Sequence, residues 1–146
     1  AVLVWSLACD TEGGKPVAEP AFTFPPGAET TEGAVVRFPV TMLDNTFDPT
    51  ELTVPGGATI ELNITNKGAA IHNLRLAGAD NLYANSDDAV ADPPLVNPGE
   101  TAVLRWLAPV SGGTFDFRCD FHPQAMTGKI VVTPGEESTN GGQEGP

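Results

Sequence analysis

Apolar and polar residues alternate along several short stretches of this chain, and each stretch ends at a turn. Ile60, Leu62 and Ile64 alternate with polar residues, and a Pro-Gly-Gly turn precedes them at residues 55–57. A period of two places one set of side chains in the core and the other in water, as in a half-buried β-strand. The chain also contains 16 Gly and 14 Pro, and both residue types interrupt helices. The sequence therefore predicts many short strands joined by turns.

The alternation predicts about seven strands in the middle of the chain. We expect them at residues 35–42, 52–54, 60–64, 71–76, 102–107, 115–119 and 129–133. Met42, Trp106, Phe115 and Phe117 then face the core, and such a set is typical of a β-sandwich. Residues 77–94 form a long polar connection, which predicts a short helix or a mobile loop.

The composition divides the chain into one folded body and two tails. A length of 146 residues suits a single domain with its own core. Residues 10–32 and 135–146 are poor in large apolar side chains, so we expect a flexible linker and a disordered tail. The folded domain is predicted at residues 33–134.

The first nine residues are mostly apolar and end at Cys9. This segment is similar to the end of a bacterial lipoprotein signal, although Ser6 stands where Leu is usual. We therefore expect an exported protein at the periplasmic or extracytoplasmic membrane surface, with Cys9 as its lipid anchor. A truncated transmembrane anchor or an N-terminal strand is the alternative.

Charge limits the class of partner. The chain has 19 acidic and 7 basic residues, a formal net charge of −12. Such a surface repels nucleic acid and anionic membranes and attracts a basic protein surface. Asp87, Asp88 and Asp92 predict either an acidic docking face or a solvated loop.

Three metal-binding side chains lie close together near the end of the predicted strands. Cys119, His122 and Met126 supply a thiolate, an imidazole and a thioether within eight residues. This soft donor set suits copper that cycles between Cu(I) and Cu(II). One loop cannot close such a site, so a distant strand must supply another ligand, and His72 is the only other His. Gln124 is the alternative to Met126 as an axial ligand.

The segment after residue 118 reads Cys-Asp-Phe-His-Pro-Gln-Ala-Met-Thr-Gly-Lys-Ile-Val-Val. It resembles the C-terminal ligand loop of the cupredoxins, the type 1 blue copper proteins, and in particular the plastocyanin and amicyanin branch. Residues 45–49, 54–57 and 66–73 resemble earlier segments of that family, so the likeness spans about residues 35–133. The gap between His122 and Met126 is one residue longer than in amicyanin and shorter than in plastocyanin.

The resemblance implies a fold, a metal and the residues that hold it. The expected fold is all-β, a Greek-key β-sandwich of about seven to eight strands. It implies one type 1 copper ion with His72, Cys119 and His122 as ligands and Met126 as the weak axial ligand. Beside them, Asn73 would tie the two ligand segments together, and Asp120 stands where a hydroxyl residue is common.

These expectations favour a carrier of single electrons that acts by outer-sphere transfer and is not an enzyme. Its partners would be redox proteins with a basic docking surface. The carrier itself would be a monomer. His122 would pass the electron, with Phe121 and Pro123 either forming an apolar docking patch or only shaping the loop. A copper chaperone or sensor of the same fold is the alternative.

Other chemistries fit the residues less well. A hydrolase would need a third group to orient Cys119 and His122. Structural zinc would need more thiolates or imidazoles than the chain has. The binuclear copper centre of oxidase subunits needs a second Cys in the loop, and multicopper oxidases need several His-x-His pairs.

Overall fold

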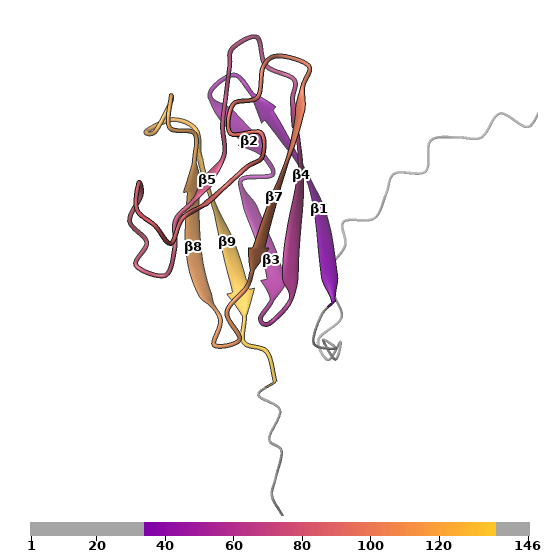
Figure 1. The fold of residues 1–146 in the computed structure, drawn as a ribbon, viewed down its shortest axis with the longest axis vertical. Coiled ribbons are helices and arrows are strands. Elements are labelled where there is room, and N and C mark those ends of the chain that lie inside the picture. Colours follow the sequence, from indigo (N-terminus) through magenta and orange to yellow (C-terminus); the bar gives the residue numbers. More distant parts are fainter. Residues whose placement is uncertain (1–33, 137–146) are drawn as a thin grey trace, which may run out of the picture.

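The structure, a computed structural model, describes residues 34–136, and these form two packed β-sheets (Figure 1). The strands are β1 (Val35–Leu43), β2 (Thr46–Asp48), β3 (Glu51–Pro55), β4 (Thr59–Asn66), β5 (Arg75–Leu76), β6 (Ala89–Val90), β7 (Thr101–Leu107), β8 (Gly113–Arg118) and β9 (Thr127–Thr133). One sheet has the order β2-β1-β4-β7 and the other the order β3-β9-β8-β5-β6. The described part of the chain includes no helix that is long and apolar enough to cross a membrane. The predicted all-β sandwich is confirmed. It has nine strands, more than the seven to eight expected, because β2 and β6 are too short to show an alternation in the sequence.

Strand pairing brings the ends of three strands to one end of the sandwich. β1 runs parallel to β4, from Val35 opposite Thr59 to Met42 opposite Asn66. β8 runs antiparallel to β9, so the loop between them is closed where Arg118 pairs with Thr127. This loop and the turn after β1 lie near the top of Figure 1, at the end where β1, β4 and β8 finish.

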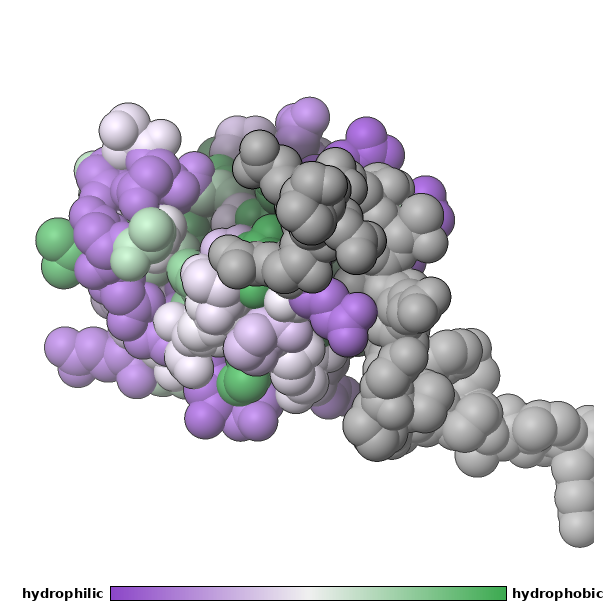
Figure 2. All heavy atoms as spheres, turned by 90° about the horizontal axis from the view of Figure 1, so that it is seen from below, coloured by the Kyte–Doolittle hydropathy of each residue, from purple (hydrophilic) through white to green (hydrophobic). Residues whose placement is uncertain are grey.

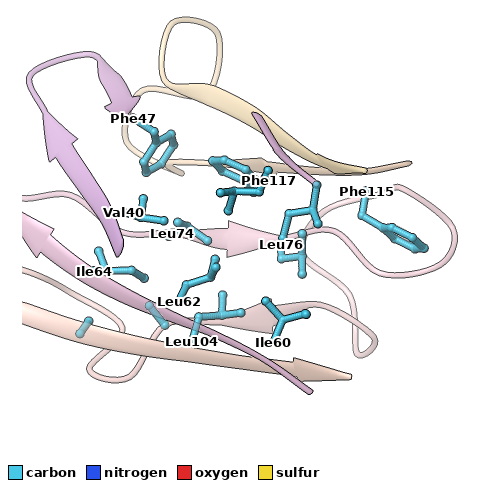
Figure 3. Packing of buried hydrophobic residues seen from close by; sticks show 14 of the residues in the cluster. Val40, Phe47, Ile60, Leu62, Ile64, Leu74, Leu76, Leu104, Phe115 and Phe117 are labelled. Atoms are coloured by element: carbon cyan, nitrogen blue, oxygen red, sulfur yellow. The ribbon is translucent and has the colours of Figure 1, made fainter. Parts of the chain in front are cut away.

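The core lies between the two sheets (Figure 3). Ile60, Leu62 and Ile64 of β4 are at most 1% exposed, as their alternation predicts. They face Phe117 of β8, whose ring meets that of Phe47 edge-on at 5.1 Å between centroids. Each such fully buried side chain stabilises the fold by about 1.5–3 kcal/mol. The predicted core residues Met42, Phe115 and Phe117 are buried, and Trp106 packs against them while partly exposed.

The alternation alone predicts that the polar face of β4 lies in water, but part of this face is buried. Glu61 is 6% exposed because Arg37 of β1 and Arg105 of β7 are its neighbours in register. Arg37 Nε donates to Glu61 Oε1 at 3.0 Å, and Arg105 Nε donates to Oε2 at 2.9 Å. The end of the sandwich opposite the β8–β9 loop shows mostly hydrophilic residues around separate apolar ones (Figure 2).

The connection at residues 77–94 contains turns and the short strand β6, and no helix. Of the two predicted alternatives, the structure therefore shows a loop. Asn81 and Ala84 have φ angles of 55° and 69°, in the left-handed region where a right-handed helix cannot continue. Asn81 fixes the loop to β8, because its side chain exchanges hydrogen bonds with Asp116.

Candidate metal centre

His72 lies in the segment between β4 and β5, with its imidazole fully buried. The residue forms an isolated β-bridge with Val96. Its N–H donates to Val96 O at 3.2 Å, and Val96 N–H donates back at 2.9 Å. This bridge fixes the backbone of His72, although His72 lies outside the named strands.

The loop at residues 119–126 is closed by its own backbone. Cys119 N–H donates to Met126 O at 3.0 Å, at the place where β8 and β9 separate. Inside the loop, His122 N–H donates to Cys119 O and Met126 N–H donates to His122 O, at 3.1 and 2.9 Å. These bonds fold the loop into tight turns and hold its three candidate ligands around one point.

The structure brings His72, Cys119 and His122 together. Cys119 Sγ lies 3.8 Å from Nδ1 of both His72 and His122. The three donor atoms all lie within 4.8 Å of one another. Metal–nitrogen and metal–sulfur bonds are about 2.0–2.3 Å long, so atoms at these separations can share one ion. Cys119 and His72 are fully buried, whereas His122 is partly exposed.

Met126 is fully buried at the end of the same loop, and its backbone is bonded to Cys119 and His122. Gln124, the alternative axial ligand, is exposed. A thiolate, two imidazoles and a thioether form a soft donor set of the kind that copper prefers. The types of residue present therefore fit a copper ion.

Asn73 and Asp120 join the two ligand segments, which are 47 residues apart in sequence. Asn73 Nδ2 donates to Asp120 Oδ2 at 2.9 Å, and Asp120 N–H donates to Asn73 Oδ1 at 2.7 Å. The backbone N–H of Asn73 points at Cys119 Sγ, 3.5 Å away. Such contacts around ligands orient them and adjust the electron density on sulfur.

Two arginines also bind the carboxylate of Asp120. Arg75 Nε donates to Oδ2 at 2.8 Å, and Arg118 Nε donates to Oδ1 at 3.1 Å. Burial would raise the pKa of Asp120, but hydrogen bonds from Arg75, Asn73 and Arg118 outweigh it and hold the pKa below its ordinary value. The same contact with Asp120 raises the pKa of Arg75. Asp120 is thus a carboxylate with charged donors on both oxygens.

Asp44 faces the other nitrogen of His72 and was not expected at the site. Its Oδ1 lies 3.4 Å from His72 Nε2 and accepts hydrogen bonds from the N–H groups of Ala69 and Ala70. Those backbone donors hold the pKa of Asp44 below its ordinary value. In the sequence Asp44 is only a turn residue, and no local pattern indicates a contact with a residue 28 positions away.

The structure shows which of the residues predicted to form docking surfaces are exposed. Phe121 is 53% exposed beside His122, and Pro123 is exposed too. Asp87 and Asp92 are exposed, but the side chain of Asp88 is only 1% exposed and pairs with Arg75. The prediction that Asp88 belongs to an exposed acidic loop is therefore wrong, because its charge is already matched inside the protein.

The chain matches known proteins over most of its length. A family model described as a cupredoxin-like domain matches residues 3–132. Auracyanin-A of Chloroflexus aurantiacus is 32% identical over 108 residues, which cover 59% of this chain and 66% of that protein. This chain therefore spans slightly less than two thirds of the length of that relative.

Solved structures show the same likeness. The structure of auracyanin A, described as a blue copper protein of Chloroflexus aurantiacus, has a TM-score of 0.57 and 28% identity, and the match covers 68% of this chain and all of that one. Dithionite-reduced auracyanin of Roseiflexus castenholzii has a TM-score of 0.58 at 23% identity, covering 70% of this chain and all of that one. The second match supports the fold alone.

Proposed function

This chain belongs to the cupredoxin-like family, and from that premise we propose that it is a mononuclear type 1 copper protein that carries single electrons between redox partners. The observation that carries the proposal is the meeting of two imidazole nitrogens and one cysteine sulfur within 4.8 Å at one end of the sandwich. The family match explains why such a set would bind copper, and one structural relative is itself described as a blue copper protein.

We assign His72, Cys119 and His122 as the ligands and Met126 as the axial ligand. Copper bound there would supply the Cu(I)/Cu(II) couple. The chain supplies a fixed frame, because the bridge at Val96 and the bonds within the loop at residues 119–126 hold the donors. Donors that are held in place move little when an electron arrives, so transfer is fast. In the proposed outer-sphere mechanism no substrate binds to the metal. The proposal assigns no catalytic residue, and the role is that of a carrier.

Electrons would pass through His122. This ligand is partly exposed, whereas His72 is fully buried. Phe121, which precedes His122, is 53% exposed, and Ile71, which precedes His72, is 45% exposed. An apolar surface of this kind can be covered by a partner protein. His122→Gly is expected to perturb the site and slow electron self-exchange, and unchanged kinetics with an intact spectrum would contradict this role.

The partner and the location are further parts of the proposal. The net charge of −12 supports a redox partner with a basic surface. Export to the periplasmic or extracytoplasmic membrane surface, with a lipid on Cys9, rests on the sequence alone, since Cys9 lies outside the described residues. We propose that the carrier acts as a monomer.

Adding one equivalent of Cu(II) to the purified chain tests the function. We expect an intense blue thiolate-to-copper band that a reductant bleaches and an oxidant restores. Cys119→Ser should lose the band, since Cys119 lies with the two His residues, whereas Cys9→Ser should keep it. A colourless complex, or a band that survives Cys119→Ser, would sink the proposal. Rapid release of copper to an acceptor without reversible redox chemistry would favour a chaperone or sensor.

A further inference from the structure

We propose that the loop at residues 79–88 is part of the scaffold of the metal centre, and that Arg75 is the positioning residue that links this loop to Cys119. The inference rests on the proposed copper site, and it concerns residues that touch no ligand. The link runs from Asp88 through Arg75 to Asp120, which follows Cys119 directly.

Arg75 bridges two carboxylates from different parts of the chain. Its Nε donates to Asp120 Oδ2 at 2.8 Å, and its Nη1 donates to Asp88 Oδ2 at 3.0 Å. The guanidinium group is planar and rigid, so it fixes the spacing and orientation of the groups bound to it. A lysine could satisfy the charge but not both directions.

Asp88 is the fixed point at the loop end of this link. Its side chain is 1% exposed, and its Oδ2 also accepts the N–H of Ala84 at 2.7 Å. Among the described residues its other oxygen has no hydrogen-bond partner. A buried carboxylate is costly unless it is paired, so the position of Asp88 depends on Arg75 and on the turn at Ala84.

A second contact ties the same loop to the same carboxylate. The guanidinium of Arg118 lies 4.0 Å over the ring of Tyr83, and its Nε donates to Asp120 Oδ1 at 3.1 Å. A cation over an aromatic ring is attracted to the ring face. Both oxygens of Asp120 are therefore connected to residues 79–88, one through Arg75 and the other through Arg118.

Movement at Asp120 reaches the metal centre by two routes. Its backbone continues from Cys119, and it exchanges hydrogen bonds with Asn73, whose N–H points at Cys119 Sγ. A shift of Asp120 therefore changes both the direction of the thiolate and the hydrogen bond to it. Either change alters copper–sulfur overlap and hence the visible spectrum.

Neighbouring acidic residues provide a matched comparison in the copper-loaded full-length chain. Asp88→Asn and Asp87→Asn remove the same charge one residue apart, but Asp87 is exposed and forms no ion pair within residues 34–136. We expect Asp88→Asn to change the relative intensity of the visible charge-transfer bands and the copper hyperfine splitting, and to weaken copper binding by about 10-fold. Asp87→Asn should leave all three unchanged.

A double variant shows whether the effect passes through Arg75. Arg75→Met alone should change the same spectra, and Asp88→Asn should add nothing in that background, because coupled residues are not additive. Arg75→Lys should rescue only part of the wild-type spectrum. Spectra of Asp88→Asn that equal those of Asp87→Asn, or that persist undiminished in the Arg75→Met background, would overturn the inference.

Two further measurements separate this link from general stability and from the copper proposal. Glu61→Gln also removes a carboxylate held by two arginines, but far from the ligands, so it should lower stability without changing the spectra. In the metal-free chain, Asp88→Asn should speed chemical modification of the buried Cys119 thiol several-fold over Asp87→Asn. Equal thiol reactivity counts against the link, whereas a colourless wild type counts against the copper site.

Discussion

At the scale of single residues, Gly68 leaves the space in which Asp44 meets His72. A Cβ atom on Gly68 would lie 2.5 Å from Asp44 Oδ1 and 3.1 Å from His72 Nε2. A proton on His72 Nε2 can be donated to Asp44 Oδ1, 3.4 Å away, and Nδ1 is then free to bind metal. Gly68 thus matters for the candidate site because it has no side chain to separate Asp44 from His72.

Gly68→Ala is expected to weaken copper binding by about 10- to 100-fold, because the new methyl group pushes Asp44 away from His72. A competitive chelator titration measures the loss. Asp44→Ala should give a similar loss, and the double variant should be no weaker than either single one. Additive losses would show that Gly68 acts by another route.

Replacing Met126 tests its proposed axial role. Met126→Leu should retain a blue site and raise the reduction potential, because a donor to Cu(II) is lost, whereas Met126→Gln should lower it by supplying an oxygen donor. Voltammetry of the loaded chain gives the shift. Met42→Leu is the control, since Met42 is equally buried but lies within β1, and a potential that is the same in all three variants would exclude axial ligation.

The proposed ligands could be named from the sequence because their residue types are scarce. The chain has only two His, two Cys and two Met, so spacing alone selects among few combinations. Asp44, Arg75 and Arg118 belong to common charged types, and their contacts with the site depend on side-chain directions that only the folded chain defines. The ligand candidates could therefore be named from the sequence, whereas most of the residues that hold them in place could not.

At the scale of elements, β8 and β9 hold the ligand loop, and a glycine makes their packing possible. Phe117 of β8 stands opposite Gly128 of β9. A Cβ atom on Gly128 would overlap the Phe117 ring and lie 2.7 Å from Thr50 O. The Gly that follows Met126 by two residues is therefore explained by the ring that covers it.

Gly128→Ala should lower the free energy of unfolding by about 1–3 kcal/mol, because the overpacked ring must move. Urea unfolding of the metal-free chain measures the change. Phe117→Leu in the same chain frees space at the ring, so the double variant should lose less than the sum of the two single losses. A fully additive result would refute the contact.

The lowered pKa of Glu61 implies that the free energy of unfolding depends on pH. Burial would raise its pKa, but Arg105 and Arg37 outweigh burial and hold the pKa below the ordinary value of 4.5. The ionised carboxylate therefore stabilises the fold above pH 4.5, and this contribution is lost as the pH falls through the lowered pKa. Glu61→Gln should be less stable than the wild type at pH 7.

The difference between wild type and Glu61→Gln should shrink below pH 4.5 in urea unfolding at a series of pH values. Glu51→Gln is the control, because Glu51 pairs with Lys129 at an exposed position and such pairs contribute little. A difference that stays constant down to pH 3 would contradict this assignment.

Long alternating strands were predictable, and the shortest ones were not. β4 and β7 show their period over eight and seven residues, whereas β2 and β6, with three and two residues, show none and were missed. The strand expected at residues 71–76 is reduced to the two residues of β5, because only Arg75 and Leu76 pair with β8. The position of Asp88 inside the loop before β6 follows from the same tertiary contacts.

At the scale of the whole molecule, the surface carries mainly unmatched negative charge. Five of the six Lys and Arg residues in the described part of the chain form ion pairs, so the remaining acidic groups dominate the field. Over distances of about 8 Å or more at physiological ionic strength, such a field is screened by salt.

Electron transfer to a small cationic oxidant should slow by about 10-fold between low and high salt, because screening removes the attraction. The rate with an anionic oxidant of similar potential should rise over the same range. Stopped-flow bleaching of the blue band gives both rates. Identical salt dependence for the two reagents would show that net charge does not guide the encounter.

The fold class and the position of the body were predictable because turns and alternation are local. The predicted boundaries at residues 33 and 134 stay predictions, as do the linker, the tail and the segment that ends at Cys9. Family membership, which the match over residues 3–132 shows, supports the site more than any single motif does.

The order of strands in the second sheet also has a consequence in time. β9 follows every other described strand along the chain, yet it lies between β3 and β8 inside its sheet. Neither the sheet nor the donor set can be complete until residues 119–133 have left the ribosome. The proposed copper site can therefore form only after every other described strand has been made.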